Sequence, residues 1–531
     1  MLLAQVTTPA AAVVDQPAAY FLWSVLVVAV GLLIWDTVEV GRNDAANLIN
    51  AVFGARILSR KNAIRVAGAG VVLGAVFASP VIDTARKGIF NPPMLTLQQA
   101  LCVYVAVYIV DTILLYGYSA FGMPVSTTAT LVFELLGASF AIQYFDIVHW
   151  DTCARVIQAI VASIVLAGIM AFFVQRIVRG AIRDRTGNLS VLLAHGGWVG
   201  GGMLAGLSYF LLMKGMRTVG FVRDLRSEFI ESYGALTIIL VLWIIFAVLI
   251  HLLLVAFRRR AARLLFPVLA VLGTVAMAFA FGQNDLANCA APGIAVFTLF
   301  WAWFGGNADV VIVATEVTVP KALLAVCGIL LFLGMMTRNA QRVTSAAVRS
   351  GSMGDHVKLW APAPFVRMAH WLLERQRRRS DLAPAPALSP RGKKMHYDSL
   401  RACVIMYVSA SVIATASSLG YPVSTTYVAF SAIMASGMGD RIFQRGDSAL
   451  KLGRFLWVVF CWFAAAVIAA VAAGIVCRAI YHLGLVGIVV VLAANLLTRR
   501  YLRNRSDKHE QHVREASEER MHPEDYALEE A

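Results

Sequence analysis

Residues 41–47 read GRNDAAN and residues 282–288 read GQNDLAN, so one polar motif occurs twice in the chain. A second motif, PVSTT, occupies residues 124–128 and returns at residues 422–426. The two pairs follow the same order, which indicates that the chain consists of two related halves. Duplicated halves with polar interruptions of hydrophobic segments at matching positions are typical of secondary transporters.

Long apolar runs surround these motifs. The 531 residues are 59% hydrophobic and only 15% charged, with a mean hydropathy of +0.72, whereas soluble domains have about 45–50% apolar and about 25% charged residues. A membrane helix needs about 20 apolar residues, and many such runs are present. We therefore expect an all-α polytopic protein of the cell (inner) membrane, with about 11–13 transmembrane helices, two inverted repeats, and broken helices or re-entrant hairpins.

The predicted organisation has seven parts. They are an extracytoplasmic N-terminal tail, a first inverted repeat, connecting transmembrane helices, the first part of a second inverted repeat, a basic cytoplasmic loop, the second part of that repeat, and a charged C-terminal tail. In this order they cover residues 1–18, 19–178, 179–263, 264–337, 338–400, 401–500 and 501–531.

Loop charge predicts that the halves are inverted. The sequence after the first Asn-Asp motif is basic at residues 56–65, whereas the sequence after the second is acidic at residues 309–316. Because basic loops favour the cytoplasm, equivalent loops fall on opposite faces of the membrane. The apolar stretches 44–58 and 285–304 follow polar breaks and are predicted to be half-helices.

Several classes of protein are excluded by the composition. The basic residues that give the net charge of +15 lie in short connections between spans, as the positive-inside rule requires. No nucleic-acid-binding signature accompanies them. Seven cysteines form no CxxC pair, so a disulfide framework and a zinc site are unsupported. The sequence contains no Walker loop, which argues against an ATP-driven pump. It also contains no nucleophile–base pair with a spacing that would indicate an enzyme. No cofactor is expected apart from a coupling cation.

Two segments leave alternatives open. In the basic region 338–400, apolar residues recur at helical spacing at 365, 368, 369 and 372, which fits either an amphipathic helix on the inner leaflet or a solvated loop. The glycine run at residues 196–206 predicts close helix packing, and a homodimer contact is one form that it can take.

The Asn-Asp motifs place carboxylates where charge is costly. Asp44 and Asp285 lie inside apolar stretches, and such residues persist where they bind an ion, relay protons or line a cavity. Asn43 and Asn47 are one helical turn apart. Carboxylate and amide oxygens are hard ligands that suit Na⁺ or another hard cation. The alternative is polar contact between helices.

The PVSTT motifs resemble helix starts. Proline and hydroxyl residues at the beginning of an apolar segment are helix-initiation signals, and a helix N-terminus with unpaired N–H groups attracts anions. Ordinary capping is the alternative reading. Two N-termini and two carboxylates together predict a cation-coupled oxyanion symporter, because a cation offsets the cost of moving an anion into a negative interior.

These motifs resemble the inorganic phosphate transporter family, whose members carry Gly-x-Asn-Asp-x-x-Asn in each of two inverted repeats. The stretch DTARKGI at residues 83–89 also resembles that family. The resemblance implies import of inorganic phosphate by Na⁺ or H⁺ symport. It implies these phosphate ligands: Ser126, Thr127, Thr128, Ser424, Thr425, Thr426, Asn43 and Asn284. It implies these cation ligands: Asp44, Asn47, Asp285 and Asn288.

The chain departs from the family at the residue before each Asn-Asp pair. Arg42 and Gln283 stand where alanine is common, and Arg42 can either add positive potential at the site or turn away from it. A sulfate or other oxyanion permease, and an uncoupled anion channel or receptor, remain alternatives. Asp111 and Glu134 lie inside apolar spans and fit either a proton relay or buried hydrogen bonding.

Overall fold

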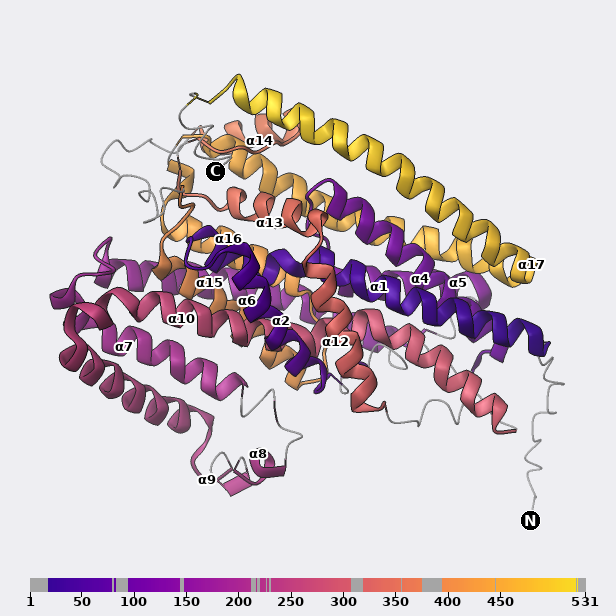
Figure 1. Cartoon of the computed structure of the whole chain (residues 1–531), viewed down its shortest axis with the longest axis horizontal. Coiled ribbons are helices and arrows are strands. Elements are labelled where there is room, and N and C mark those ends of the chain that lie inside the picture. The colour runs from indigo at the N-terminus through magenta and orange to yellow at the C-terminus, as the bar shows by residue number, and fades with distance from the viewer. Residues whose placement is uncertain are drawn as a thin grey trace, which may run out of the picture.

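The structure is a computed structural model that describes residues 18–523, apart from 79–80, 83–93, 144–147, 212–215, 217–219, 226, 229–230, 307–318, 355, 375–393, 445 and 522. Helices joined by short connections make up most of the described part (Figure 1). Their bounds are α1 Ala19–Gly54, α2 Arg60–Ala75, α4 Leu97–Ala120, α5 Thr127–Gln143, α6 Trp150–Ile182, α7 Leu189–Ser208, α8 Gly220–Leu225, α9 Glu231–Tyr233, α10 Ala235–Phe304, α12 Lys321–Met335, α13 Arg338–Ser350, α14 Ala363–Leu373, α15 Ser399–Ser418, α16 Thr425–Gly439, η5 Ile442–Gln444 and α17 Ser448–Glu518.

The predicted all-helical membrane fold is confirmed. In the described part of the chain seven helices are long and apolar enough to cross a membrane, or eight if α12 and α13, bent by 71°, form one broken span. Two of the seven, α10 and α17, are hairpins of two arms, because the backbone reverses at Arg258 (φ 43°) and Gly484 (φ 58°) (Figure 1).

The number of full-length spans is below the expected 11–13 because several apolar segments form short helices. The helices α2, α5 and α16 have 16, 17 and 15 residues. At 1.5 Å per residue, each is about 22–26 Å long, whereas the hydrocarbon core of a bilayer is about 30 Å thick. Short helices that end inside the protein place their termini near its centre.

The half-helices predicted at 44–58 and 285–304 are wrong. Helix α1 is continuous from Ala19 to Gly54, and the second arm of α10 runs on through the second motif to Phe304. A polar turn inside an apolar helix keeps its backbone hydrogen bonds, so only its side chains need partners. The breaks that create helix termini lie instead at the two PVSTT motifs, where α5 and α16 begin.

The two halves are inverted and exchange packing partners. The motif-bearing helix α1 and the second arm of α10 run in opposite directions (Figure 1). Each short helix packs on the long helix of the other half, α5 on α17 and α16 on α6. Neither half therefore buries its short helix alone.

The basic region 338–400 is partly built into the core. Helix α13 packs against α1, and α14 packs against α17. The predicted helix around residue 365 is present as α14, with Phe365 against Trp457 and Phe460 on α17. Residues 375–393, the N-terminal residues 1–17 and the stretch 83–89 lie outside the described residues.

The glycine run at 196–206 serves packing within the chain. A side chain at Gly197 or Gly201 would collide with the backbone of Ala247, because α7 lies against the first arm of α10 at these positions. Close approach of two helices through small residues is the expected use of such a run in a membrane. Gly197 and Gly201 are thus used for packing within the chain, whereas a Cβ at Gly206 would meet no atom within 4 Å.

Candidate functional site

The four repeated motifs meet at one buried centre. The twelve site residues predicted from the sequence come from α1, α10 and the starts of α5 and α16, and none is more than 4% exposed. Each polar side chain here needs a partner inside the protein, because burying an unpaired polar group is costly. The contacts between the motifs are therefore informative about their roles.

Thr127 joins the two carboxylates. Its hydroxyl Oγ1 lies 3.1 Å from Asp285 Oδ1 and 3.4 Å from Asp44 Oδ2. Asn288 Nδ2 donates to the same hydroxyl at 2.9 Å and to Asp285 Oδ1 at 2.9 Å. Two buried carboxylates thus share one hydroxyl, and their like charges favour a cation or a proton between them.

Asp44 has a second set of partners from the other half of the chain. Thr426 Oγ1 lies 2.7 Å from Asp44 Oδ1, and Asn47 Nδ2 donates to the same oxygen at 2.8 Å. Asn47 Nδ2 also lies 3.0 Å from Thr426 Oγ1. The start of α16 is therefore held by the motif on α1.

The second threonine of each PVSTT motif reaches across to the opposite motif. Thr128 donates to the carbonyl of Val423 at 3.0 Å, and Thr426 lies 3.1 Å from the carbonyl of Val125. The two contacts are equivalent under the repeat. They bring the N-termini of α5 and α16 together, which is the arrangement of helix starts that the sequence predicted.

The first asparagine of each motif holds a loop. Asn43 Oδ1 accepts from the N–H of Val125 at 3.2 Å, and Asn284 Oδ1 accepts from the N–H of Val423 at 3.2 Å. Their amide groups donate to Ser119 Oγ at 2.9 Å and to the carbonyl of Val423 at 2.5 Å. The side-chain amides of Asn43 and Asn284 thus hydrogen-bond to the backbone before α5 and α16 or to a side chain next to it. Their role in the structure is to hold the starts of these helices in position.

The serines of the PVSTT motifs cap their own helices. Ser126 Oγ accepts from the N–H of Ala129 at 3.0 Å, and Ser424 Oγ accepts from the N–H of Tyr427 at 3.1 Å. Such a cap satisfies one of the N–H groups that a helix start leaves free. The N–H groups at the first positions, Thr127 and Thr128 in α5 and their counterparts in α16, have no intrahelical partner.

Three oxygen atoms of the site have no hydrogen-bond partner among the described residues. They are Asp285 Oδ2, Asn288 Oδ1 and Thr425 Oγ1, and all are buried. Thr425 lies beside Asp285. All three belong to the second half of the chain, and two of them, Asp285 Oδ2 and Asn288 Oδ1, belong to its Asn-Asp motif.

Acidic residues on one side of the centre belong to the first half alone. Asp111 Oδ1 lies 3.0 Å from Thr130 Oγ1, which is also 3.0 Å from the carbonyl of Thr127. Buried Asp36 and Glu134 find no N–H or hydroxyl donor within the described residues. At the equivalent positions of the second half, Met277 stands for Asp36, Ser409 for Asp111 and Ala432 for Glu134. Asp36 was missed in the sequence, although a carboxylate in the first apolar span was the signal.

Tyr108 was also missed, and it shapes α10 beside the second motif. Its hydroxyl donates to the carbonyl of Cys289 at 2.6 Å and accepts from the N–H of Gly293 at 2.7 Å. In a regular helix these two backbone groups would bond to each other. Pro292 stands next to this opening, and the tyrosine satisfies the groups that it separates.

Arg42 turns away from the centre. Its guanidinium forms an ion pair with Glu39 at 2.7 Å and donates to Thr337 Oγ1 at 3.3 Å. The side chain is 17% exposed, whereas the neighbouring Asn43 and Asp44 are fully buried. The sequence allowed Arg42 either to add positive potential at the site or to turn away from it, and the structure shows that it turns away.

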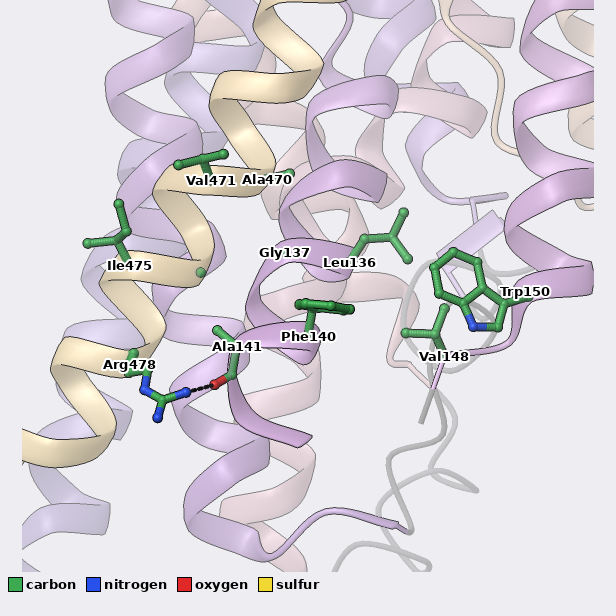
Figure 2. A pocket seen from close by; sticks show the side chains of 11 residues that line it. Leu136, Gly137, Phe140, Ala141, Val148, Trp150, Ala470, Val471, Ile475 and Arg478 are labelled. Atoms are coloured by element: carbon green, nitrogen blue, oxygen red, sulfur yellow. Dashed lines mark hydrogen bonds between the residues drawn. The ribbon is translucent and has the colours of Figure 1, made fainter. Parts of the chain in front are cut away.

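A large groove elsewhere is lined almost entirely by apolar residues. It has a volume of about 550 Å³ and lies between α5, the first arm of α17 and the start of α6 (Figure 2). Phe140, Trp150 and Val471 line it, and its one charged side chain, Arg478, donates to the carbonyl of Ala141 at 3.0 Å. The central cluster is the candidate site.

A helical membrane protein whose inverted halves join two helix N-termini to buried carboxylates is a secondary transporter in its architecture. The sequence profile of the phosphate transporter family matches residues 40–347 and 391–473, which is well over half of the chain. The chain therefore belongs to the phosphate transporter family. The resemblance inferred from the repeated motifs is confirmed, and the chain is a multi-pass membrane transporter and not an enzyme.

Relatives match along nearly their whole length. A "putative phosphate permease" of Pyrococcus horikoshii is 25% identical over 476 residues, covering 87% of this chain and 98% of the relative. A protein of the same name from Chlamydia muridarum is 24% identical over 466 residues, covering 83% and 95%. A solved structure named "The sodium-dependent phosphate transporter" matches with a TM-score of 0.63 at 21% identity, covering 87% and 98%, which shows a common fold.

Proposed function

We propose that this chain imports inorganic phosphate together with Na⁺ or H⁺, and that the central cluster holds both. The observation that carries the proposal is the position of Thr127, whose hydroxyl lies within 3.4 Å of a carboxylate oxygen from each half. At this point the start of α5, which favours an anion, adjoins two carboxylates, which favour a cation. Family membership supports phosphate as the anion.

Phosphate is assigned to the helix starts. The N–H groups and hydroxyls of Thr127, Thr128, Thr425 and Thr426 are the donors, and the partial positive charge of two helix N-termini adds to them. Ser126 and Ser424 are not assigned as donors to phosphate, because their hydroxyls cap α5 and α16. They support the site by holding the two helix starts. Asn43 and Asn284 hold the loops before those helices.

The cation is assigned to the Asn-Asp motifs. Asp44, Asn47, Asp285 and Asn288 supply carboxylate and amide oxygens, and three free oxygen atoms lie on the second-half side. Sodium prefers such hard oxygen ligands. The name of the solved structure of similar fold, a sodium-dependent transporter, favours Na⁺ over H⁺ for this chain.

The central residues are closed off on both sides, since none is more than 4% exposed. A transporter that alternates between two openings passes through such an occluded arrangement. The exchange of threonine contacts between the halves gives a means of coupling. Release of Thr426 from Asp44 would loosen the start of α16 as well as the cation site.

Transport by purified protein in proteoliposomes tests the proposal. Radiolabelled phosphate should accumulate above its equilibrium level when an inward Na⁺ gradient is imposed, and a pH gradient imposed separately identifies H⁺ coupling. Phosphate that equilibrates with no response to either gradient would contradict symport. Sulfate that competes as well as phosphate would instead identify a broader oxyanion permease.

The proposed function requires one chain, because both halves of the site come from the same polypeptide. The glycine run that motivated a homodimer packs α7 against α10. A homodimer stays a prediction. The molar mass of the detergent-solubilised protein, measured by light scattering with the detergent subtracted, tests it.

A further inference from the structure

Two pockets that share lining residues are lined by arginines. One has a volume of about 280 Å³ and the other of about 510 Å³, and Tyr116 and Arg503 line both. The arginines around them come from α1, α13 and the second arm of α17, which lie in contact. We call the two pockets together the arginine vestibule, with these members: Arg42, Arg338, Arg342, Arg499, Arg500 and Arg503.

The vestibule has more positive than negative charge. Glu39 pairs with both Arg42 and Arg499, at 2.7 and 2.8 Å. Arg342 pairs with Asp507 at 2.7 Å and also with Glu510. Three carboxylates thus face six arginines. Within the described residues no ion pair is formed by the remaining arginines, which are Arg338, Arg500 and Arg503.

The paired arginines are held in place by aromatic rings. The guanidinium of Arg499 lies 4.3 Å from the ring centre of Trp35 and 4.6 Å from that of Tyr116. Arg42 lies 5.8 Å from the ring centre of Tyr116. Cation–π contacts of this kind orient a guanidinium without neutralising it. Arg42 and Arg499 therefore form an ordered wall. The positive charge that no carboxylate pairs with is carried by the other members named above, Arg338, Arg500 and Arg503.

The start of α13 opens into the same space. Thr337, Arg338 and Asn339 line the smaller pocket, and Thr337 makes no side-chain cap to its helix. The hydroxyl of Thr337 donates to the carbonyl of Gly334 at 2.8 Å instead. The first N–H groups of α13 therefore add partial positive charge to that of the arginines.

The vestibule lies where the last apolar span ends. Leu496 lines the larger pocket and is 54% exposed, and the basic run begins three residues later at Arg499. An apolar wall next to several arginines matches an anionic lipid, whose chains stay in the membrane while its phosphate meets the basic groups. The same donors also match free phosphate.

We propose that the arginine vestibule binds a phosphate group, supplied either by the headgroup of an anionic phospholipid or by inorganic phosphate. This site is separate from the central one. Asn43 and Asp44 are fully buried, whereas their neighbour Arg42 points out into the vestibule. A ligand in the vestibule therefore contacts the helix that carries the first Asn-Asp motif, but not the motif itself.

A triple variant of the unpaired arginines tests the proposal. Arg338→Gln, Arg500→Gln and Arg503→Gln together remove the surplus charge and leave every ion pair named above intact. Each arginine near an anionic surface contributes about fivefold to affinity, so three contribute about 100-fold. The matched control is Arg259→Gln, Arg260→Gln and Arg263→Gln, which removes three exposed arginines at the turn of α10.

Two measurements on the full-length protein distinguish the sources of the phosphate group. Native mass spectrometry of protein from mixed phosphatidylglycerol and phosphatidylcholine detects retained lipid, and equilibrium binding of radiolabelled phosphate in neutral detergent counts bound phosphate. If a lipid is the ligand, the triple variant loses phosphatidylglycerol and the control keeps it. If free phosphate is the ligand, the triple variant binds one phosphate fewer per chain than the control.

The proposal is overturned if the triple variant and the control agree in both measurements. A variant of the central site, Thr127→Val with Thr425→Val, separates this outcome from failure of the proposed function. That variant should bind phosphate more weakly at the central site but keep whatever the vestibule binds. Thermal unfolding of each variant in the same detergent verifies that the arginine substitutions leave the fold intact.

Discussion

Replacing Thr127 by valine is the sharpest test of the central site. Valine keeps the shape and removes the hydroxyl, which lies 3.1 Å from Asp285 Oδ1 and 3.4 Å from Asp44 Oδ2. Asp285 Oδ1 would keep Asn288 as its donor, at 2.9 Å. Since the backbone N–H of residue 127 also remains, phosphate binding should fall without vanishing.

The magnitude follows from the charge of the partners. A hydrogen bond to a charged group contributes about 1.5–3 kcal/mol, which corresponds to about 10- to 150-fold in affinity. We expect this loss of phosphate affinity for Thr127→Val and for Thr425→Val. The two variants should differ in stability, because Thr127 Oγ1 contacts Asp44, Asp285 and Asn288, whereas the contact of Thr425 in the site is with Asp285 alone.

The assay combines equilibrium phosphate binding with thermal unfolding of each purified variant. Thr274→Val is the matched control, because Thr274 is a buried threonine of α10 whose hydroxyl donates to its own helix at Ala270. The control should keep wild-type phosphate affinity. Unchanged affinity in both site variants would refute the reasoning, since the PVSTT motifs would then be helix caps and the anion would bind elsewhere.

Other residues give further tests. Asp44→Asn and Asp285→Asn should each abolish gradient-driven phosphate uptake while the protein stays in the membrane, and full cation-dependent accumulation by both would contradict the cation assignment. Asn43→Ala and Asn284→Ala should each lower the free energy of unfolding by about 1–3 kcal/mol, because each leaves a buried N–H of the loop before α5 or α16 unpaired; denaturation in detergent measures this. Tyr108→Phe should destabilise the protein by a similar amount, since it leaves the carbonyl of Cys289 and the N–H of Gly293 unpaired; a thermal unfolding curve identical to that of wild type would show that α10 closes without the hydroxyl.

The helical membrane class, the duplication and the meeting of the motifs could be predicted from the sequence. Apolar runs of bilayer length determine the class, because hydrocarbon admits only helices or closed barrels. The repeats at 41–47 and 282–288, and at 124–128 and 422–426, implied a shared site because costly buried carboxylates need partners. The structure brings those four segments together and begins a helix at each PVSTT motif.

The role of each atom was decided by tertiary structure. Thr426 finds Asp44, and Asn284 finds the backbone of Val423, across 382 and 139 positions of sequence. No local pattern reports such partners, which is why the sequence did not show that Asn43 and Asn284 hold loops. The ion pair of Arg42 with Glu39 is local, because the two residues are one turn apart on α1, and that spacing is a signal the sequence does contain. The half-helices were wrong because they too depend on distant partners. Polarity at residues 43–47 is a local property, but whether a helix breaks there depends on the donors that the other half of the chain supplies.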